Sequence, residues 1–198
     1  MARWPGSLEC WAPVLEDLAP LLTRRVEWVA LDFSGHGAST SSPPTGRWDE
    51  YHVAEAREVL QSELRAVAPA SRTVGVGHSM GGAVLAALEL RQPGSLARVA
   101  AIEPPIFPAA ARCLGLPLVA SEVAAGYDGG AAVTLVTCSA SRFSPLLLPG
   151  SGPAAYSLVA QTLRAGVVRL PGASHHLVVQ EQPALVARLV ADEVAAIV

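Results

Sequence analysis

The fold is decided by the stretch Val74-Gly75-Val76-Gly77-His78-Ser79-Met80-Gly81-Gly82, which runs directly into Ala83-Val84-Leu85-Ala86-Ala87-Leu88-Glu89-Leu90. The residues before the serine favour a short strand, and those after the glycines are strong helix formers. A Gly-x-Ser-x-Gly turn between a strand and a helix places its central residue on a sharp bend. We therefore expect the Ser79 hydroxyl to lie at the tip of a strand-to-helix turn.

Such a bend needs space around the serine. Gly77 and Gly81 are expected to provide it, because they carry no Cβ to block the approaching strand or a substrate. Ser79 then lies at a helix N-terminus, where the backbone N–H of Met80 can stabilise a developing oxyanion. The pattern predicts a nucleophilic serine; the alternative is a glycine-rich turn with an idle serine.

A second motif agrees with the first in order and spacing. An expected strand at 26–31 ends in Asp32-Phe33-Ser34-Gly35-His36-Gly37-Ala38-Ser39. Together the two motifs resemble the α/β-hydrolase family, in which the Gly-x-Ser-x-Gly turn carries the catalytic serine. The resemblance implies a serine hydrolase acting on an ester or related acyl substrate through an acyl-enzyme, without a metal or organic cofactor.

Strands and helices alternate along the chain. This alternation predicts an α/β fold with a mostly parallel sheet and helices on both faces. We expect a single domain over 1–198 with a short lid-like insertion at about 106–131. Strands are expected at 26–31, 74–77, 98–102, 133–137 and 167–170, and helices at 14–22, 53–67, 83–90, 154–165 and 183–198; residues 1–11 are expected to form a loop.

Composition and charge narrow the class of protein. Of the 198 residues, 51% are hydrophobic and 16% charged, which suits one buried core. A net charge of −3 without a basic cluster gives no reason to expect nucleic acid. Cys10, Cys113 and Cys138 are an odd number at wide spacing, which suggests neither a disulfide framework nor a zinc site. Without a membrane-length apolar run or a signal-peptide pattern, we expect a cytoplasmic protein.

A serine hydroxyl needs a base to take its proton. The five histidines are His36, His52, His78, His175 and His176. His36 and His78 lie inside the two motifs, and His52, at the start of a helix, is expected at the surface. His175 and His176 follow the last strand, where catalytic groups of open α/β sheets gather. Pro171-Gly172-x-x-His175, followed by Glu181-Gln182-Pro183, resembles the family's histidine loop, which implies His175 as the base.

The acid that orients this base is less obvious. Residues 129–180 contain no Asp or Glu, so the loop that usually supplies the acid in the resembled family holds none. The candidates between the serine and the histidines are Glu89, Glu103, Glu122 and Asp128. Glu103 directly follows a strand, at the sheet edge where the site should lie. Some family members draw their acid from that position, and we therefore expect Glu103 to complete the triad.

The chain looks incomplete beside the family. Members normally begin with two or three further strands and a turn that supplies a second oxyanion N–H; the nearest match here is Trp4. One of those strands normally lies between 26–31 and the serine's strand, so we expect a gap or new pairing there. The leading hypothesis is a hydrolase acting on a small molecule with an apolar part; the alternative is a truncated or non-catalytic hydrolase-like binding protein.

Overall fold

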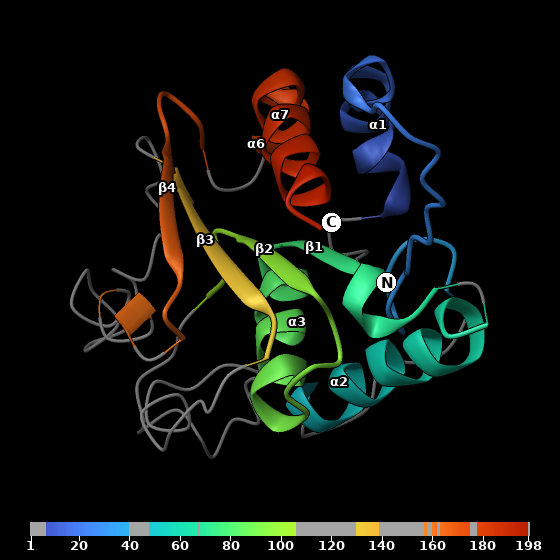
Figure 1. Cartoon of the computed structure of the whole chain (residues 1–198). Coiled ribbons are helices and arrows are strands. Elements are labelled where there is room, and N and C mark those ends of the chain that lie inside the picture. Colours follow the sequence, from blue (N-terminus) through green and yellow to red (C-terminus); the bar gives the residue numbers. More distant parts are fainter. Residues whose placement is uncertain are drawn as a thin grey trace.

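Four parallel strands form the sheet at the centre of the chain (Figure 1). The computed structural model describes residues 7–39, 48–66, 68–105, 130–138, 157, 160–161, 163–174 and 178–197. The strands are β1 (Val74–His78), β2 (Arg98–Ile102), β3 (Ala132–Cys138) and β4 (Gly166–Leu170), in the order β1-β2-β3-β4. All three pairings are parallel, so the four carboxyl ends meet at one edge of the sheet. Four of the expected strands are thereby confirmed.

Helices cover both faces of this sheet, as predicted (Figure 1). Helices α2 (Trp48–Val59) and α3 (Met80–Arg91) lie on one face, and α1 (Ala12–Leu18), α6 (Val178–Glu181) and α7 (Pro183–Ala195) lie on the other. The shorter helical turns are η1 (Leu8–Trp11), η2 (Ala19–Leu21), η3 (Leu60–Leu64) and η4 (Ala70–Arg72). The expected loop over 1–11 is therefore wrong for its last residues, which form η1 in front of α1.

Strand alternation divides the core into two layers. Successive residues of a strand point to opposite faces, and in β2 Val99 and Ala101 join the cluster beneath α2 and α3, whereas Ala100 and Ile102 join the cluster beneath α1 and α7. All four are fully buried. Because both faces are covered, the strand reads as a continuous apolar run rather than an alternating one.

A buried carboxylate joins α7 to the sheet. Glu193 is 5% exposed, accepts a hydrogen bond from the Thr134 hydroxyl at 2.6 Å and pairs with the Arg98 guanidinium. Burying a charge is costly unless it is paired and hydrogen-bonded, and Glu193 satisfies both conditions. This contact therefore fixes α7 across β2 and β3.

The expected strand at 26–31 is wrong. This segment forms no regular secondary structure and pairs with no described strand, and Trp28 and Val29 are 45% and 48% exposed. Among the described residues nothing pairs with the outer edge of β1 either, since β1 ends the sheet order. A strand needs a neighbour to satisfy its backbone groups. Within the described residues β1 is therefore an edge strand, and 26–31 remains outside the sheet.

Two expected elements fall partly outside the described residues. They are the lid-like insertion at about 106–131, of which only residues 130 and 131 are described, and half of the helix expected at 154–165, where the described residues 157, 160 and 161 are helical. No helix in the described part of the chain has the length and apolar character of a membrane span.

Candidate active site

Ser79 lies on the bend between β1 and α3. It is the N-cap residue of α3 with φ 51° and ψ −121°, and its side chain makes no capping hydrogen bond. Its N–H donates to the Ile102 carbonyl at 2.8 Å, which continues the β1–β2 ladder by one residue, and its own carbonyl accepts the Ala83 N–H at 3.1 Å. A non-glycine residue in this region of φ is strained by about 1–3 kcal/mol. The main chain therefore holds Ser79 from both sides in the expected strained turn.

The tight approach of the strand to the helix explains two glycines. A Cβ on Gly77 would lie 2.4 Å from the Gly81 carbonyl carbon, and a Cβ on Gly82 would lie 2.8 Å from the Gly77 carbonyl oxygen. A Cβ on Gly81 meets no described atom within 4 Å. The expectation is therefore confirmed for Gly77, but the second glycine that the close approach requires is Gly82 rather than Gly81.

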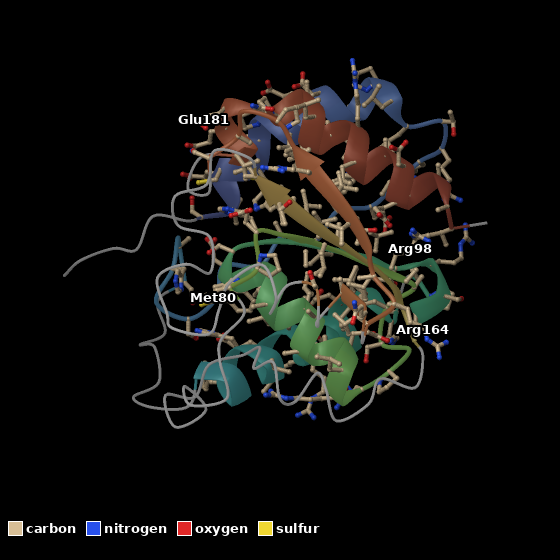
Figure 2. The ribbon with its side chains drawn as sticks, turned by 90° about the vertical axis from the view of Figure 1, so that its left-hand side faces the viewer. Met80, Arg98, Arg164 and Glu181 are labelled. Carbon is tan, nitrogen blue, oxygen red and sulfur yellow. The ribbon has the colours of Figure 1, made fainter. Side chains whose placement is uncertain are left out.

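Met80 is the first residue of α3, directly after Ser79. The Ala83 N–H makes the first bond of the helix, to the Ser79 carbonyl. The N–H groups of Met80, Gly81 and Gly82 precede this bond, and such groups at a helix N-terminus can bind an anion. Figure 2 shows Met80 and Glu181 at the carboxyl edge of the sheet, and Arg98 and Arg164 at the opposite edge.

Glu103 lies beside Ser79 at the end of the neighbouring strand. The residues before them, His78 and Ile102, are paired in the β1–β2 register, and Glu103 has φ 49°. Its side chain is 2% exposed. Its N–H donates to the Val136 carbonyl at 2.7 Å, and its Oε1 accepts the Cys138 N–H at 2.5 Å. A buried carboxylate thus lies at the sheet edge that was predicted for the acid.

The main chain at the end of β3 therefore holds the Glu103 carboxylate. Cys138 itself is buried, 7% exposed. Burial first, and then the Glu103 and Glu181 carboxylates, raise the pKa of the Cys138 thiol to about 12. The thiol is therefore neutral at physiological pH. It adds no second negative charge beside the Glu103 carboxylate.

Glu89, another candidate acid, has a different place in the fold. It is fully buried in α3, where its carboxylate accepts the N–H groups of Gly94 at 2.5 Å, Ala131 at 2.8 Å and Leu96 at 3.2 Å. These partners precede β2 and β3, at the amino edge of the sheet. Glu89 therefore joins three backbone segments at the edge opposite Ser79. Glu122 and Asp128 lie outside the described residues.

The loop after β4 is described only at its two ends. His175 and His176 lie outside the described residues, as does Trp4. The Ser174 hydroxyl donates to Glu181 Oε2 at 2.8 Å, and Gln182 Nε2 donates to the Pro171 carbonyl at 2.9 Å. These two bonds close the loop at its base. Glu181 and Gln182 brace this loop, a role that the motif match alone does not predict but that their position just after the loop could have indicated.

His52 corrects another expectation. It is 1% exposed rather than at the surface, and its Nδ1 lies 2.7 Å from Glu55 Oε2. The Phe33 ring packs 4.9 Å from its ring, centroid to centroid. Helix α2 extends N-terminally to Trp48, so His52 lies within the helix rather than at its start. A polar residue in the first half of an amphipathic helix gave no sequence signal of burial.

Two cavities bordered by described residues lie away from Ser79. The larger, of about 570 Å³, is lined by Pro69, Ala70, Ser71, Gly94, Leu96, Ala97 and Gly130. These residues precede β1, β2 and β3, so this cavity opens at the amino edge of the sheet. The smaller, of about 160 Å³, lies between α2 and α3. In the part of the chain that the structure describes, no group of three His, Cys, Asp or Glu side chains could hold a metal ion.

Comparison with known sequences gives the class of protein. The sequence profile of the alpha/beta hydrolase family matches residues 4–149. The chain therefore belongs to the α/β-hydrolase family. A search of curated protein sequences finds no significant match.

Solved structures agree on the fold. The monoacylglycerol lipase of Paleococcus ferrophilus is similar with a TM-score of 0.69 and 16% identity, over 97% of this chain and 91% of that one. A lipase-esterase related protein from Clostridium acetobutylicum has a TM-score of 0.64 and 13% identity, over 96% and 89%. The esterase domain of a Rhodothermus marinus protein has a TM-score of 0.57 and 18% identity, over 94% and 79%. At such low identity these similarities establish the fold alone.

Proposed function

We propose that the chain is a serine hydrolase that cleaves an ester or related acyl substrate. The observation that carries the proposal is the placement of Ser79 and Glu103. Both follow directly after the paired residues His78 and Ile102, and both have positive φ values, 51° and 49°. Strained non-glycine residues cluster at active sites, where the surrounding fold holds a side chain in a functional position. Membership of the hydrolase family supports the same reading.

Ser79 is the proposed nucleophile. Its turn has the strand–serine–helix context of a nucleophile elbow. Attack of the Ser79 Oγ on the substrate carbonyl forms the new C–O bond, and the hydroxyl proton moves to the base.

His175 is the proposed base, with His176 as the alternative. The last described residue before them, Ser174, is tied to Glu181 at the carboxyl edge of the sheet (Figure 2). The histidine takes the proton from Ser79 and gives it to the leaving alcohol when the tetrahedral intermediate collapses. The same histidine then activates a water, which releases the acid product and restores the serine.

Glu103 is the proposed acid. A carboxylate hydrogen-bonded to the histidine fixes its tautomer and stabilises the imidazolium formed during attack. The Cys138 N–H at 2.5 Å from Oε1 stabilises the charged form of Glu103 within the buried site. Oriented in this way, the carboxylate needs no further reorganisation when the imidazolium forms.

The oxyanion is proposed to be held by the backbone N–H groups of Met80 and Trp4. Met80, at the start of α3, supplies the first donor, and its position next to Ser79 supports this role. Trp4 is the nearest match to the family's second donor. The open space beside Gly81 leaves room for a substrate above the turn. A small molecule with an apolar part is the proposed substrate.

A second candidate function is a hydrolase-like binding protein without catalysis. The segment at 26–31 favours it, because this segment does not enter the sheet and leaves Trp28 and Val29 exposed. An enzyme needs its groups held close to the reacting geometry, and a segment outside the described sheet gives the loop after it no support from strand pairing.

Hydrolysis of short p-nitrophenyl esters by the purified chain distinguishes the two candidates. We expect turnover by the wild type that is abolished in Ser79→Ala. Ser71→Ala is the matched control, because Ser71 lies in η4 at the amino edge of the sheet. A folded wild type without turnover would support the binding protein instead, whereas equal turnover in Ser79→Ala would rule out Ser79 as the nucleophile.

A further inference from the structure

One carboxylate joins two segments that are distant in sequence. Asp32 Oδ1 accepts the Leu8 N–H at 2.8 Å, and Asp32 Oδ2 accepts the Ala38 N–H at 2.9 Å. Leu8 begins η1 near the N-terminus, and Ala38 lies near the end of the loop that Asp32 opens. Hydrogen bonds to a charged group are stronger than neutral ones. The N-terminal segment is therefore held against the 32–39 loop by a single side chain.

The loop is shaped around this carboxylate. Gly37 has φ +49°, and a Cβ placed on it would lie 2.1 Å from Asp32 Oδ2. Any other residue at this position would push the carboxylate away. Glycine at this place therefore serves the contact between Asp32 and the backbone.

The loop is in turn fixed to the body of the protein. The Ser34 hydroxyl donates to the Glu55 carboxylate, which also lies 2.7 Å from His52 Nδ1. Phe33 packs against the core cluster beneath α2 and α3, as does Met80. The 32–39 loop is thus anchored to α2 and to the core cluster beneath α2 and α3.

This anchoring replaces support that the sheet does not give. Because the segment at 26–31 pairs with no described strand, strand pairing does not hold the loop that follows it. Trp4, the proposed second oxyanion donor, lies four residues before Leu8. A donor must be held close to its productive position to stabilise a transition state.

We infer that Asp32 is a positioning residue: its carboxylate fixes Leu8, at the start of η1, against the loop anchored to α2 and the core, and so supports the segment that carries the proposed second oxyanion donor. The inference rests on the proposed function. Asp32 does not touch the substrate and exchanges no proton. Its effect should therefore be on transition-state stabilisation, and so on kcat, rather than on substrate binding.

Asp32→Asn is the variant that tests this inference. An amide is similar in shape but can accept only one of the two N–H groups, because its own N–H₂ faces the other. The matched control is Asp17→Asn, which makes the same chemical change on an exposed part of α1. The measurements are the rate of labelling by a fluorophosphonate probe, kcat and KM for a p-nitrophenyl ester, and hydrogen exchange at the Leu8 and Ala38 amides.

We expect Asp32→Asn to lower kcat and the labelling rate by about tenfold or more while KM changes little. Exchange at Leu8 and Ala38 should become faster, while exchange in β1 and β2 should not change. Asp17→Asn should match the wild type in every measurement. If Asp32→Asn does not fold, Gly37→Ala displaces the same carboxylate and should give the same loss of kcat.

Three outcomes overturn the inference, and they separate it from the proposed function. A labelled wild type with an equally fast Asp32→Asn refutes the positioning role and leaves the hydrolase proposal standing. Loss confined to KM would make Asp32 a binding determinant instead. A folded wild type that does not label refutes the hydrolase proposal, and the inference about Asp32 falls with it.

Discussion

Ser79 and Glu103 lie side by side at the carboxyl edge of the sheet, one residue beyond the His78–Ile102 pair, and the Ser79 N–H donates to the Ile102 carbonyl at 2.8 Å. Both leave their strands in strained, positive-φ conformations. The separation of the two residues is therefore set by the register of β1 and β2 and not by the conformation of a long loop. The proposed nucleophile and the proposed acid thus lie on adjacent strand ends, and strands position side chains more rigidly than loops do.

The role of Glu103 is tested by Glu103→Gln. The amide keeps the shape of the side chain but cannot stabilise an imidazolium, so we expect kcat to fall by about 10²-fold or more. Glu122→Gln and Asp128→Asn are the controls and should be close to neutral. Steady-state kinetics on a p-nitrophenyl ester, with a thermal melt to show that each variant is folded, provide the measurement. Full activity in Glu103→Gln would remove it from the triad and leave Asp128 as the next candidate.

The identity of the base is tested by the two neighbouring histidines. His175→Ala should reduce kcat by several orders of magnitude, because the serine then has no group to take its proton, whereas His176→Ala should cost much less. Each variant serves as the control for the other, since the two changes are chemically identical and adjacent in the chain. The reverse ranking would assign the base to His176.

The strain at Ser79 predicts a difference between two inactive variants. Both Ser79→Gly and Ser79→Ala lose the hydroxyl, but only glycine adopts φ 51°, ψ −121° without strain. Glycine is also more flexible than alanine in the unfolded chain, which offsets part of the strain that it relieves. We therefore expect Ser79→Gly to be more stable than Ser79→Ala by about 1 kcal/mol. Urea denaturation of the two proteins measures the difference. An equal or higher free energy of unfolding for Ser79→Ala would show that the turn is not strained.

Cys138 predicts the direction of a pH effect on stability. In the folded chain, burial together with the Glu103 and Glu181 carboxylates raises the pKa of its thiol from 9.0 to about 12. Between these values the folded state keeps the proton that the unfolded state loses, so the free energy of unfolding falls as the pH rises above 9.0. Below this pH the contribution is fully present.

The control for this effect is Cys138→Ser, which does not titrate in that range. The denaturation midpoint of each protein is measured at one pH below and one pH above the ordinary thiol pKa. Between these two pH values the midpoint should fall less in Cys138→Ser than in the wild type. An identical fall in both proteins would mean that other groups account for the alkaline loss of stability.

The sequence predicted the parts of the molecule that local patterns determine. The strand at Val74–His78, the bend at Ser79 and the helix after it follow from short runs of residues whose propensities agree with the fold. The position of Glu103 followed from the rule that the carboxyl ends of parallel strands gather at one edge. The fold class was therefore readable without coordinates.

Contacts between distant segments could not be read in this way. The segment at 26–31 has the composition of a strand, but pairing depends on a neighbour that no local pattern supplies. His52 is buried because Phe33, from the loop before α2, packs against its ring. The bond between Asp32 and Leu8 spans 24 residues, and no spacing rule predicts it. These features arise from tertiary packing.

The central claim is that this fold activates Ser79 as a nucleophile, and labelling with a fluorophosphonate probe tests it most directly, because the probe needs no knowledge of the substrate. The measurement is probe incorporation into the purified, folded chain, with the modified serine located by peptide mass spectrometry. The account predicts one labelled residue, Ser79, and no labelling in Ser79→Ala. A folded wild type that does not label, or that is labelled at another serine, would contradict it.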